Sequence, residues 1–238
     1  MPYPPAYPHD PIEEVANDLF MVRGSVRMNA LMRITRNMAI VRVRGELNLV
    51  NPIRLDEAGE QALLALGEVK RILRLGPMHG MDDPYYVDRF DAEFWAQGES
   101  QNYPEPKIAQ ILATDAPLPF PDAELFAFDG TKQPESALLI RRDPGILLTC
   151  DAIQHYGDYR HNTLIARLVM PLIGFPKTTL VGPIWLKLMT PEGGSLKSEF
   201  ERLLTLDFDG LLSGHGSVLT SGAKDSVAAA VRKAFPGA

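Results

Sequence analysis

The chain has 238 residues, 45% of them hydrophobic and 23% charged, close to the average for globular proteins. This balance excludes disordered, collagen-like and coiled-coil chains and predicts one large domain with a buried core. The net charge of −6 disfavours a nucleic-acid partner. The single cysteine, Cys150, cannot form an intrachain disulfide, so nothing requires an oxidising compartment and we expect a cytoplasmic protein.

Residues 1–17 hold five prolines and lack the basic start and apolar run of a secretory signal. Proline fixes φ and removes an amide donor, so we expect an extended N-terminal arm, followed by a single domain over residues 18–238. The longest apolar stretch, 163–189, is interrupted by charged residues, prolines and glycines, so it cannot span a membrane and no membrane partner is expected. It could form a buried loop with a short helix, an apolar lid, or the interface of a homodimer.

Two-residue alternation predicts strands at 19–26 and 32–43, followed by a strand at 46–50. Asp56 is suited to cap a helix that stops at Gly67, after which the chain returns as a strand over 69–75. A strand, a crossover helix and a second strand in succession indicate a sheet covered by helices, which is an α/β arrangement.

The second half of the chain also alternates predicted strands and helices. Strands are predicted at 124–128 and 210–213, and helices at 196–204 and 223–235. Two further runs, 136–142 and 146–150, face each other as a hairpin that ends in an aspartate.

Three predicted strands end in residues that can bind a metal or move a proton. His79 and Asp83 follow one of these strands, Asp151 follows a second, and His215 follows a third between two glycines. Acids and imidazoles gathered from distant segments are what a metal site or a general acid/base pair needs. Taken alone, each residue could instead cap a helix or lie in a solvated loop.

Motifs of other activities are absent from the sequence. It holds no phosphate-binding loop, no dinucleotide-binding glycine turn, no serine-hydrolase elbow and no paired-cysteine zinc motif. Only the strand-end residues therefore point to chemistry.

The order of these pieces resembles the metallo-β-lactamase fold superfamily, in a divergent and uncharacterised branch, over most of the chain from about residue 18 to residue 235. The resemblance implies a four-layer αββα sandwich with a metal site along one edge. The family's first motif, His-x-His-x-Asp-His, corresponds to residues 79–84, where His79 and Asp83 match while Met81 and Pro84 replace two histidines.

The remaining positions of the family's metal site are partly kept. The third histidine of the family is replaced by Lys132 or a neighbour, whereas the bridging aspartate and the last histidine correspond to Asp151 and His215. One metal position then keeps only His79 and Asp151, so the resemblance implies that it is empty. The other keeps Asp83, Asp151 and His215.

Three protein ligands plus water are enough for a catalytic ion. The resemblance therefore implies a hydrolase with at most one divalent metal (zinc, manganese or iron), held by Asp83, Asp151 and His215, with His79 as an auxiliary ligand or general base. In such a site a metal-bound hydroxide attacks a carbonyl or phosphoryl centre.

Tyr85, Tyr86, Lys132 and His155 are candidates to contact a small-molecule substrate, whose identity the sequence does not reveal. The alternative is a non-catalytic binding protein that has lost the metal. In that case the Lys132 ammonium pairs with Asp151 and replaces the charge of the ion.

Overall fold

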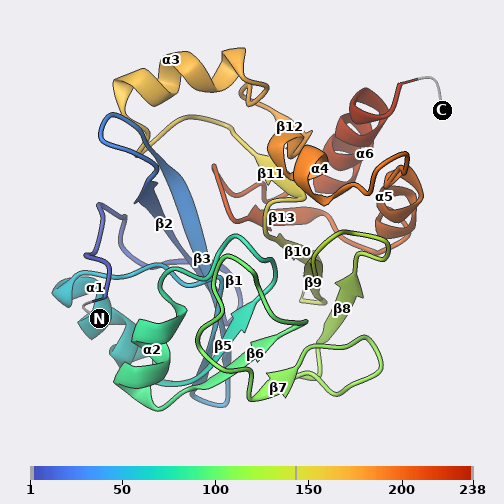
Figure 1. The fold of residues 1–238 in the computed structure, drawn as a ribbon. Coiled ribbons are helices and arrows are strands. Elements are labelled where there is room, and N and C mark those ends of the chain that lie inside the picture. The colour runs from blue at the N-terminus through green and yellow to red at the C-terminus, as the bar shows by residue number, and fades with distance from the viewer. Residues whose placement is uncertain (1–2, 143, 237–238) are drawn as a thin grey trace.

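The structure is a computed structural model that describes residues 3–142 and 144–236 (Figure 1). The strands are β1 (Glu13–Ala16), β2 (Leu19–Arg27), β3 (Arg33–Val43), β4 (Glu46–Val50), β5 (Glu68–Arg74), β6 (Glu93–Ala96), β7 (Gln110–Ile111), β8 (Ala123–Ala127), β9 (Ser136–Ile140), β10 (Ile146–Thr149), β11 (Ile153–His155), β12 (Thr179–Val181) and β13 (Gly210–Ser213). The helices are α1 (Glu57–Leu66), α2 (Asp83–Phe90), α3 (Leu164–Leu172), α4 (Pro183–Met189), α5 (Lys197–Leu203) and α6 (Ala223–Ala234).

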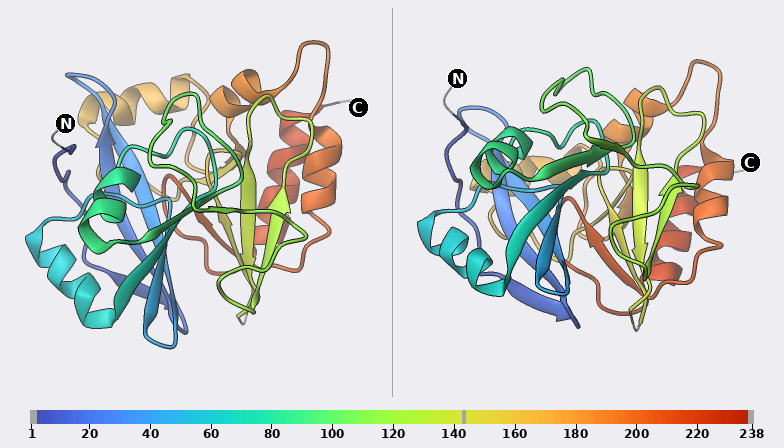
Figure 2. Two further views of the ribbon diagram at one scale, coloured as in Figure 1. Left: turned by 60° about the horizontal axis from the view of Figure 1, so that its bottom comes forward. Right: turned by 90° about the horizontal axis from the view of Figure 1, so that it is seen from below.

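Two large sheets face each other, with helices on both outer sides (Figure 2). The seven-stranded sheet has the order β1-β2-β3-β4-β5-β6-β7, and α1 and α2 cover its outer face. The four-stranded sheet has the order β13-β10-β9-β8, and α5 and α6 cover its outer face. A short ribbon of β11 and β12 lies beside them. The expected αββα sandwich is confirmed.

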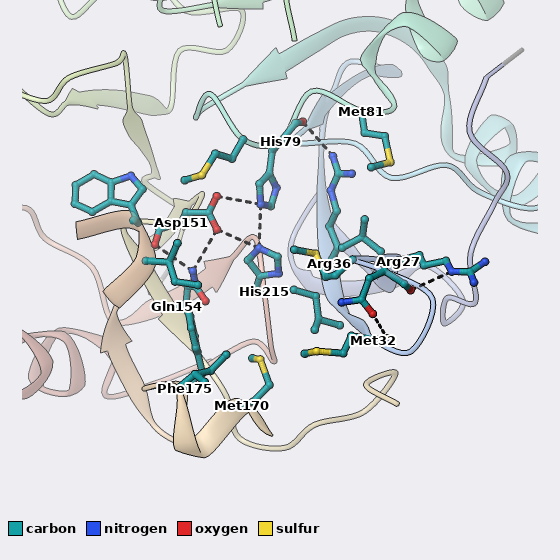
Figure 3. Close-up of a pocket in the computed structure, with 18 of the residues that line it drawn as sticks. Arg27, Met32, Arg36, His79, Met81, Asp151, Gln154, Met170, Phe175 and His215 are labelled. Atoms are coloured by element: carbon teal, nitrogen blue, oxygen red, sulfur yellow. Dashed lines mark hydrogen bonds and ion pairs between the residues drawn. The ribbon is translucent and has the colours of Figure 1, made fainter. Parts of the chain in front are cut away.

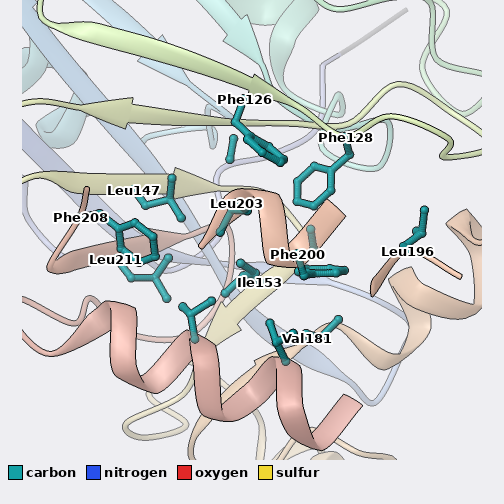
Figure 4. Packing of buried hydrophobic residues seen from close by; sticks show 14 of the residues in the cluster. Phe126, Phe128, Leu147, Ile153, Val181, Leu196, Phe200, Leu203, Phe208 and Leu211 are labelled. Carbon is teal, nitrogen blue, oxygen red and sulfur yellow. The ribbon is translucent and has the colours of Figure 1, made fainter. Parts of the chain in front are cut away.

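The strands can lie inside a four-layer sandwich because both of their faces are apolar. In β2, Leu19 and Met21 point into the core between the two sheets, while Phe20 and Val22 point toward α1 and α2. Successive side chains of a strand alternate between faces, so an unbroken apolar run serves two cores at once. Figure 4 shows the core on the far side of the smaller sheet, where the ring centroids of Phe128 and Phe200 lie 5.4 Å apart.

The predicted strand–helix–strand unit is present as β4, α1 and β5. The Asp56 carboxylate accepts the backbone N–H of Gly59 (2.8 Å) and caps α1, and Gly67 follows its last residue. β4 and β5 run parallel, as a crossover helix requires.

Helix α2 is not among the elements predicted from the sequence. Asp83–Pro84 begins this helix, and proline is favoured in the first turn since its missing N–H would have no partner there. The end of the N-terminal arm also has a regular structure. Residues 13–16 form β1, which pairs antiparallel with β2.

The apolar stretch 163–189 forms α3, β12 and α4. Helix α3 buries Ala166 and Met170 against a small core around Tyr156 and Phe175, while its other face is open to solvent. Within residues 3–142 and 144–236, no helix has the length and apolar content needed to cross a membrane.

Candidate metal centre

His79, Asp151 and His215 point toward one another, although they come from distant segments (Figure 3). β10 and β13 are parallel neighbours in register, so Asp151 and His215, two residues beyond the two strand ends, leave the smaller sheet at one edge. His79 follows β5 of the larger sheet. The Ser136 backbone N–H donates to the Leu75 carbonyl (2.7 Å) and joins the two sheets next to this edge.

The three side chains form a triangle in which the Asp151 carboxylate faces each imidazole with a different oxygen. Nε2 of His79 lies 3.1 Å from Nε2 of His215 and 3.3 Å from Oδ2 of Asp151, and Nε2 of His215 lies 3.1 Å from Oδ1 of Asp151. Ligand atoms about 2.0–2.1 Å from a tetrahedral zinc ion are separated by roughly 3.3–3.4 Å. The three side chains therefore fit one ion, and they leave a fourth position open.

Each imidazole is held in place by the surrounding backbone. Nδ1 of His215 lies 2.5 Å from the Thr35 carbonyl oxygen, which can only accept, so Nδ1 carries the proton and the Nε2 lone pair faces the triangle. The His79 ring packs against Gly214, where a Cβ would lie only 2.7 Å from its Cε1. Nη2 of Arg36 donates to the His79 carbonyl (3.1 Å) and fixes the loop that carries the ring.

The Asp151 carboxylate and backbone are anchored separately. Gln154 donates from Nε2 to Oδ1 of Asp151 (3.2 Å) and to its carbonyl (3.1 Å). The buried Glu135 carboxylate accepts the backbone N–H groups of Asp151 and Ala152, both at 3.3 Å. Such outer contacts orient a metal ligand.

The protonation states suit a metal site. Burial lowers the pKa of His79 to about 4, so its ring is neutral at pH 7. Burial opposes ionisation of Asp151, but a proton on Nε2 of a facing imidazole, which a metal ion would replace, outweighs it and holds the pKa of Asp151 well below its ordinary value. A neutral imidazole and an ionised carboxylate are the forms that bind a metal.

The triangle lies in the wall of a pocket of about 520 Å³, a volume within the range of about 300–1,000 Å³ for small-molecule sites. Among the described residues, Asp151 is the only carboxylate that lines it, and most of the other lining residues are apolar. Five of the chain's nine methionines contribute, namely Met28, Met32, Met78, Met81 and Met170.

No protein-family model and no curated protein sequence matches the chain. Solved structures do match it. DIM-1 metallo-β-lactamase superposes with a TM-score of 0.67 at 13% identity, covering 97% of this chain and 99% of that one. A metallo-β-lactamase from Erythrobacter litoralis superposes with a TM-score of 0.66 at 12% identity, covering 93% and 96% of the two chains. FIM-1 from Pseudomonas aeruginosa, in its mono-zinc form, gives 0.65 at 10% identity, covering 97% and 98%.

The chain has the metallo-β-lactamase fold. The likeness expected from the strand-end residues is confirmed at the level of the fold. In the described part of the chain, this fold brings His79, Asp151 and His215 together as a group that could hold a metal ion.

Asp83 was expected in this group, but the structure places it elsewhere. Its carboxylate lies in the first turn of α2, where Oδ2 accepts from Nε of Arg74 (2.6 Å), and both side chains are buried. Burial raises the pKa of Asp83 to about 6, against the opposing effect of Arg74. Arg74 also donates to the carbonyls of Tyr103 (2.8 Å) and Glu105 (2.9 Å). The group that could hold a metal ion therefore contains His79, expected as an auxiliary ligand, and does not contain Asp83.

The two tyrosines proposed to contact substrate do not line the pocket. They lie on α2, where the Tyr85 hydroxyl donates to Glu60 (2.9 Å) and the buried Tyr86 hydroxyl donates to the Ile53 carbonyl (2.7 Å). In this chain they join α2 to the neighbouring segments.

Lys132 and His155 also lie outside the pocket lining. Lys132 is exposed, and its backbone N–H donates to the Met189 carbonyl (2.9 Å). The expected ammonium pair with Asp151 is absent from residues 3–142 and 144–236, because the carboxylate faces the imidazoles and Gln154. His155 belongs to β11 rather than to a loop, and its Nδ1 lies 2.8 Å from Oγ1 of Thr179.

Four supporting residues were missed by the sequence reasoning: Thr35, Arg36, Glu135 and Gln154. Arg36 gave a signal, because a charge within a long apolar strand pattern needs a buried partner. Glu135 gave another, since it directly precedes a fully buried strand. Thr35 acts through its backbone carbonyl, which no residue type reveals.

Proposed function

We propose that this protein is a metal-dependent hydrolase whose single ion is held by His79, Asp151 and His215. The observation that carries the proposal is the triangle of side chains, whose facing atoms lie 3.1–3.3 Å apart pair by pair, buried beside a pocket of ligand size. The similar FIM-1 structure in its mono-zinc form supports a single-ion site in this fold.

When bound, such an ion lowers the pKa of a coordinated water and polarises a carbonyl or phosphoryl oxygen. The chain's own residues prepare the site for it. Thr35 and Gln154 hold the His215 ring and the Asp151 carboxylate in their binding orientations. The apolar pocket wall excludes bulk water, which strengthens electrostatic interactions with a reacting group.

Two imidazoles and one carboxylate form a donor set that suits zinc, and also manganese or iron(II). The test is to strip the protein with a chelator, add each of these ions, and measure bound metal per chain by elemental analysis. We expect one ion per chain, loss of binding in Asp151→Asn, and unchanged binding in His155→Gln, which alters a histidine outside the triangle.

Two results would contradict the proposal. Failure of all three ions to bind tightly would leave the non-catalytic binding protein as the better description. Equal loss in Asp151→Asn and His155→Gln would show that the ion sits elsewhere.

A further inference from the structure

The wall of the pocket has a composition that the hydrolase proposal does not explain. Five methionines line it, and its mouth is formed in part by Met28, Ile173 and Ile184, which are 59%, 48% and 51% exposed. Methionine is unbranched and has three rotatable bonds, so it adapts its shape to a flexible apolar partner. Of the polar side chains along this wall, Arg36, Gln154 and Tyr156 already form hydrogen bonds within the protein, which leaves fewer groups for a rigid polar ligand.

The charges of the pocket point the same way. The only lining carboxylate, Asp151, belongs to the triangle. Of the two lining arginines, Arg36 is already paired with Asp82 (3.4 Å) and with two backbone carbonyls. Arg27, the other lining arginine, points away from the triangle and donates to the Asn29 carbonyl (3.1 Å) (Figure 3). Little positive charge is therefore left for a phosphate beside the triangle, and an uncharged carbonyl fits better there.

We infer that the pocket holds the flexible apolar chain of an amphiphilic acyl compound, with its ester, thioester or amide carbonyl at the triangle. This inference rests on the proposed function for its reaction. Water adds to the carbonyl carbon, the bond to the leaving oxygen, sulfur or nitrogen breaks, and that atom takes a proton. The products are a fatty acid and an alcohol, thiol or amine.

The chain-binding step can be tested without metal and without turnover. Primary fatty amides of increasing length are titrated into chelator-treated protein by calorimetry, because their neutral head avoids the charge of Asp151. We expect the affinity to rise about two- to fourfold for each added methylene until the pocket is filled.

Two residues of α4 supply a matched pair of variants. Ile184 lines the pocket, whereas Leu188, one turn further on, is 49% exposed and does not. Ile184→Glu is expected to weaken amide binding about tenfold or more, since it places a charge at the apolar mouth. Leu188→Glu should leave it unchanged.

An affinity that does not depend on chain length, or an equal loss in both variants, would overturn this inference. The outcome is separable from that of the proposed function, because metal binding is measured independently. If one ion binds but amide affinity does not change with chain length, only the acyl-chain inference is contradicted. If amide affinity rises with chain length but no ion binds, only the hydrolase proposal is contradicted.

A different observation concerns the outer side of α3. Leu164, Leu168 and Leu172, here called the leucine face, lie one turn apart and are 75%, 74% and 85% exposed. They do not line the pocket. The β2–β3 hairpin tip, α3 and α4 lie along one side of the molecule, the upper edge of the left view in Figure 2.

The charge around the leucine face is of one sign. Residues 159–191 contain four lysines and arginines and no acid, in a chain whose net charge is −6. Arg167, Lys177 and Lys187 in this segment form no ion pair with a carboxylate anywhere in the described ranges. Among the described residues, the Arg27 and Arg33 side chains of the hairpin likewise hydrogen-bond to backbone carbonyls and to no carboxylate.

We propose that the leucine face docks on an anionic phospholipid membrane. Exposed leucines on a segment whose cations lack carboxylate partners suit a membrane surface, where acyl chains lie beneath negatively charged headgroups. A second copy of the chain is a poorer occupant, because a symmetric dimer would bring the same cations face to face. The earlier expectation of no membrane partner concerned a spanning segment and did not consider a surface contact.

The test is co-sedimentation with vesicles of phosphatidylcholine, with and without phosphatidylserine. We expect binding only to the vesicles with phosphatidylserine, weakened by salt and lost in Leu168→Glu. Leu64→Glu, which changes a 46% exposed leucine of α1, should bind as wild type does. Absence of vesicle binding, or a concentration-dependent dimer in ultracentrifugation that Leu168→Glu dissociates, would overturn the proposal.

Discussion

Two buried aspartates of this chain, Asp83 and Asp151, contact partners that differ in charge. Asp83 faces a permanent cation, since Nε of Arg74 lies 2.6 Å from its carboxylate. Asp151 faces two imidazoles, at 3.3 and 3.1 Å, that hold no permanent charge. Both aspartates follow strand ends and both match the metal motif of the fold family, so sequence position alone does not separate them.

The difference lies in what each carboxylate still lacks. The charge of Asp83 is neutralised inside the protein, so this residue stabilises the fold and needs no ion. Asp151 and the two imidazoles instead present electron pairs to one point, and a cation there would satisfy all three. A buried carboxylate is therefore a ligand candidate when its neighbours are other donors, and a structural residue when its neighbour is an arginine.

Removing the charge of Asp83 gives the largest expected effect. Asp83→Asn leaves the buried Arg74 guanidinium without its counter-ion, so the free energy of unfolding should fall by about 3–5 kcal/mol, measured by urea denaturation. Metal content per chain should not change in the folded protein. Loss of the metal with full stability would show instead that Asp83 is a ligand.

Adding the ion should stabilise only the Asp151 site. A ligand that binds the folded state alone raises the free energy of unfolding by about 2.7 kcal/mol when its concentration is 100 times its dissociation constant. We expect this gain with the ion that binds most tightly, and we expect its absence in Asp151→Asn. An equal gain in the free energy of unfolding of Asp151→Asn would show that the ion does not bind at the triangle.

The fold could be predicted from the sequence because its information is local. An apolar run such as 136–140 predicts a strand from its residue types alone, and Asp56 predicts the start of α1 in the same way. The ligand set could not be predicted in full. Arg74, which binds the Asp83 carboxylate, lies on β5 and contacts Asp83 only when α2 packs against that strand. Asp83–Pro84 is typical of a helix start, but no helix was predicted there.

The support of Asp151 also depended on tertiary contacts. Glu135 reaches the Asp151 backbone from the segment before β9, and Gln154 reaches its carboxylate from β11. No spacing in the sequence joins these residues. The candidate His and Asp at the strand ends were recognisable, whereas the groups that orient them were not.

The room around His79 can be tested at Gly214. A methyl group there would lie 2.7 Å from Cε1 of the ring, so Gly214→Ala should displace the imidazole and weaken metal binding by about 10–100-fold, the range seen when a ligand loses its orientation. Gly194→Ala is the control, because its nearest neighbour would lie 3.3 Å away. Equal metal affinity in both variants would mean that the His79 ring does not need this position.

The smallest effect is expected from the anchor of Asp151. Gln154→Leu removes the donor to Oδ1 but keeps a side chain of similar size, so the carboxylate should stay ionised and lose only its fixed orientation. We expect metal affinity to fall by about tenfold, the lower end of the range for such contacts, with one ion per chain at saturation. An unchanged affinity would show that the two imidazoles and the Glu135 contacts orient Asp151 by themselves. In that case the Gln154 side chain would not be needed to orient the carboxylate for metal binding.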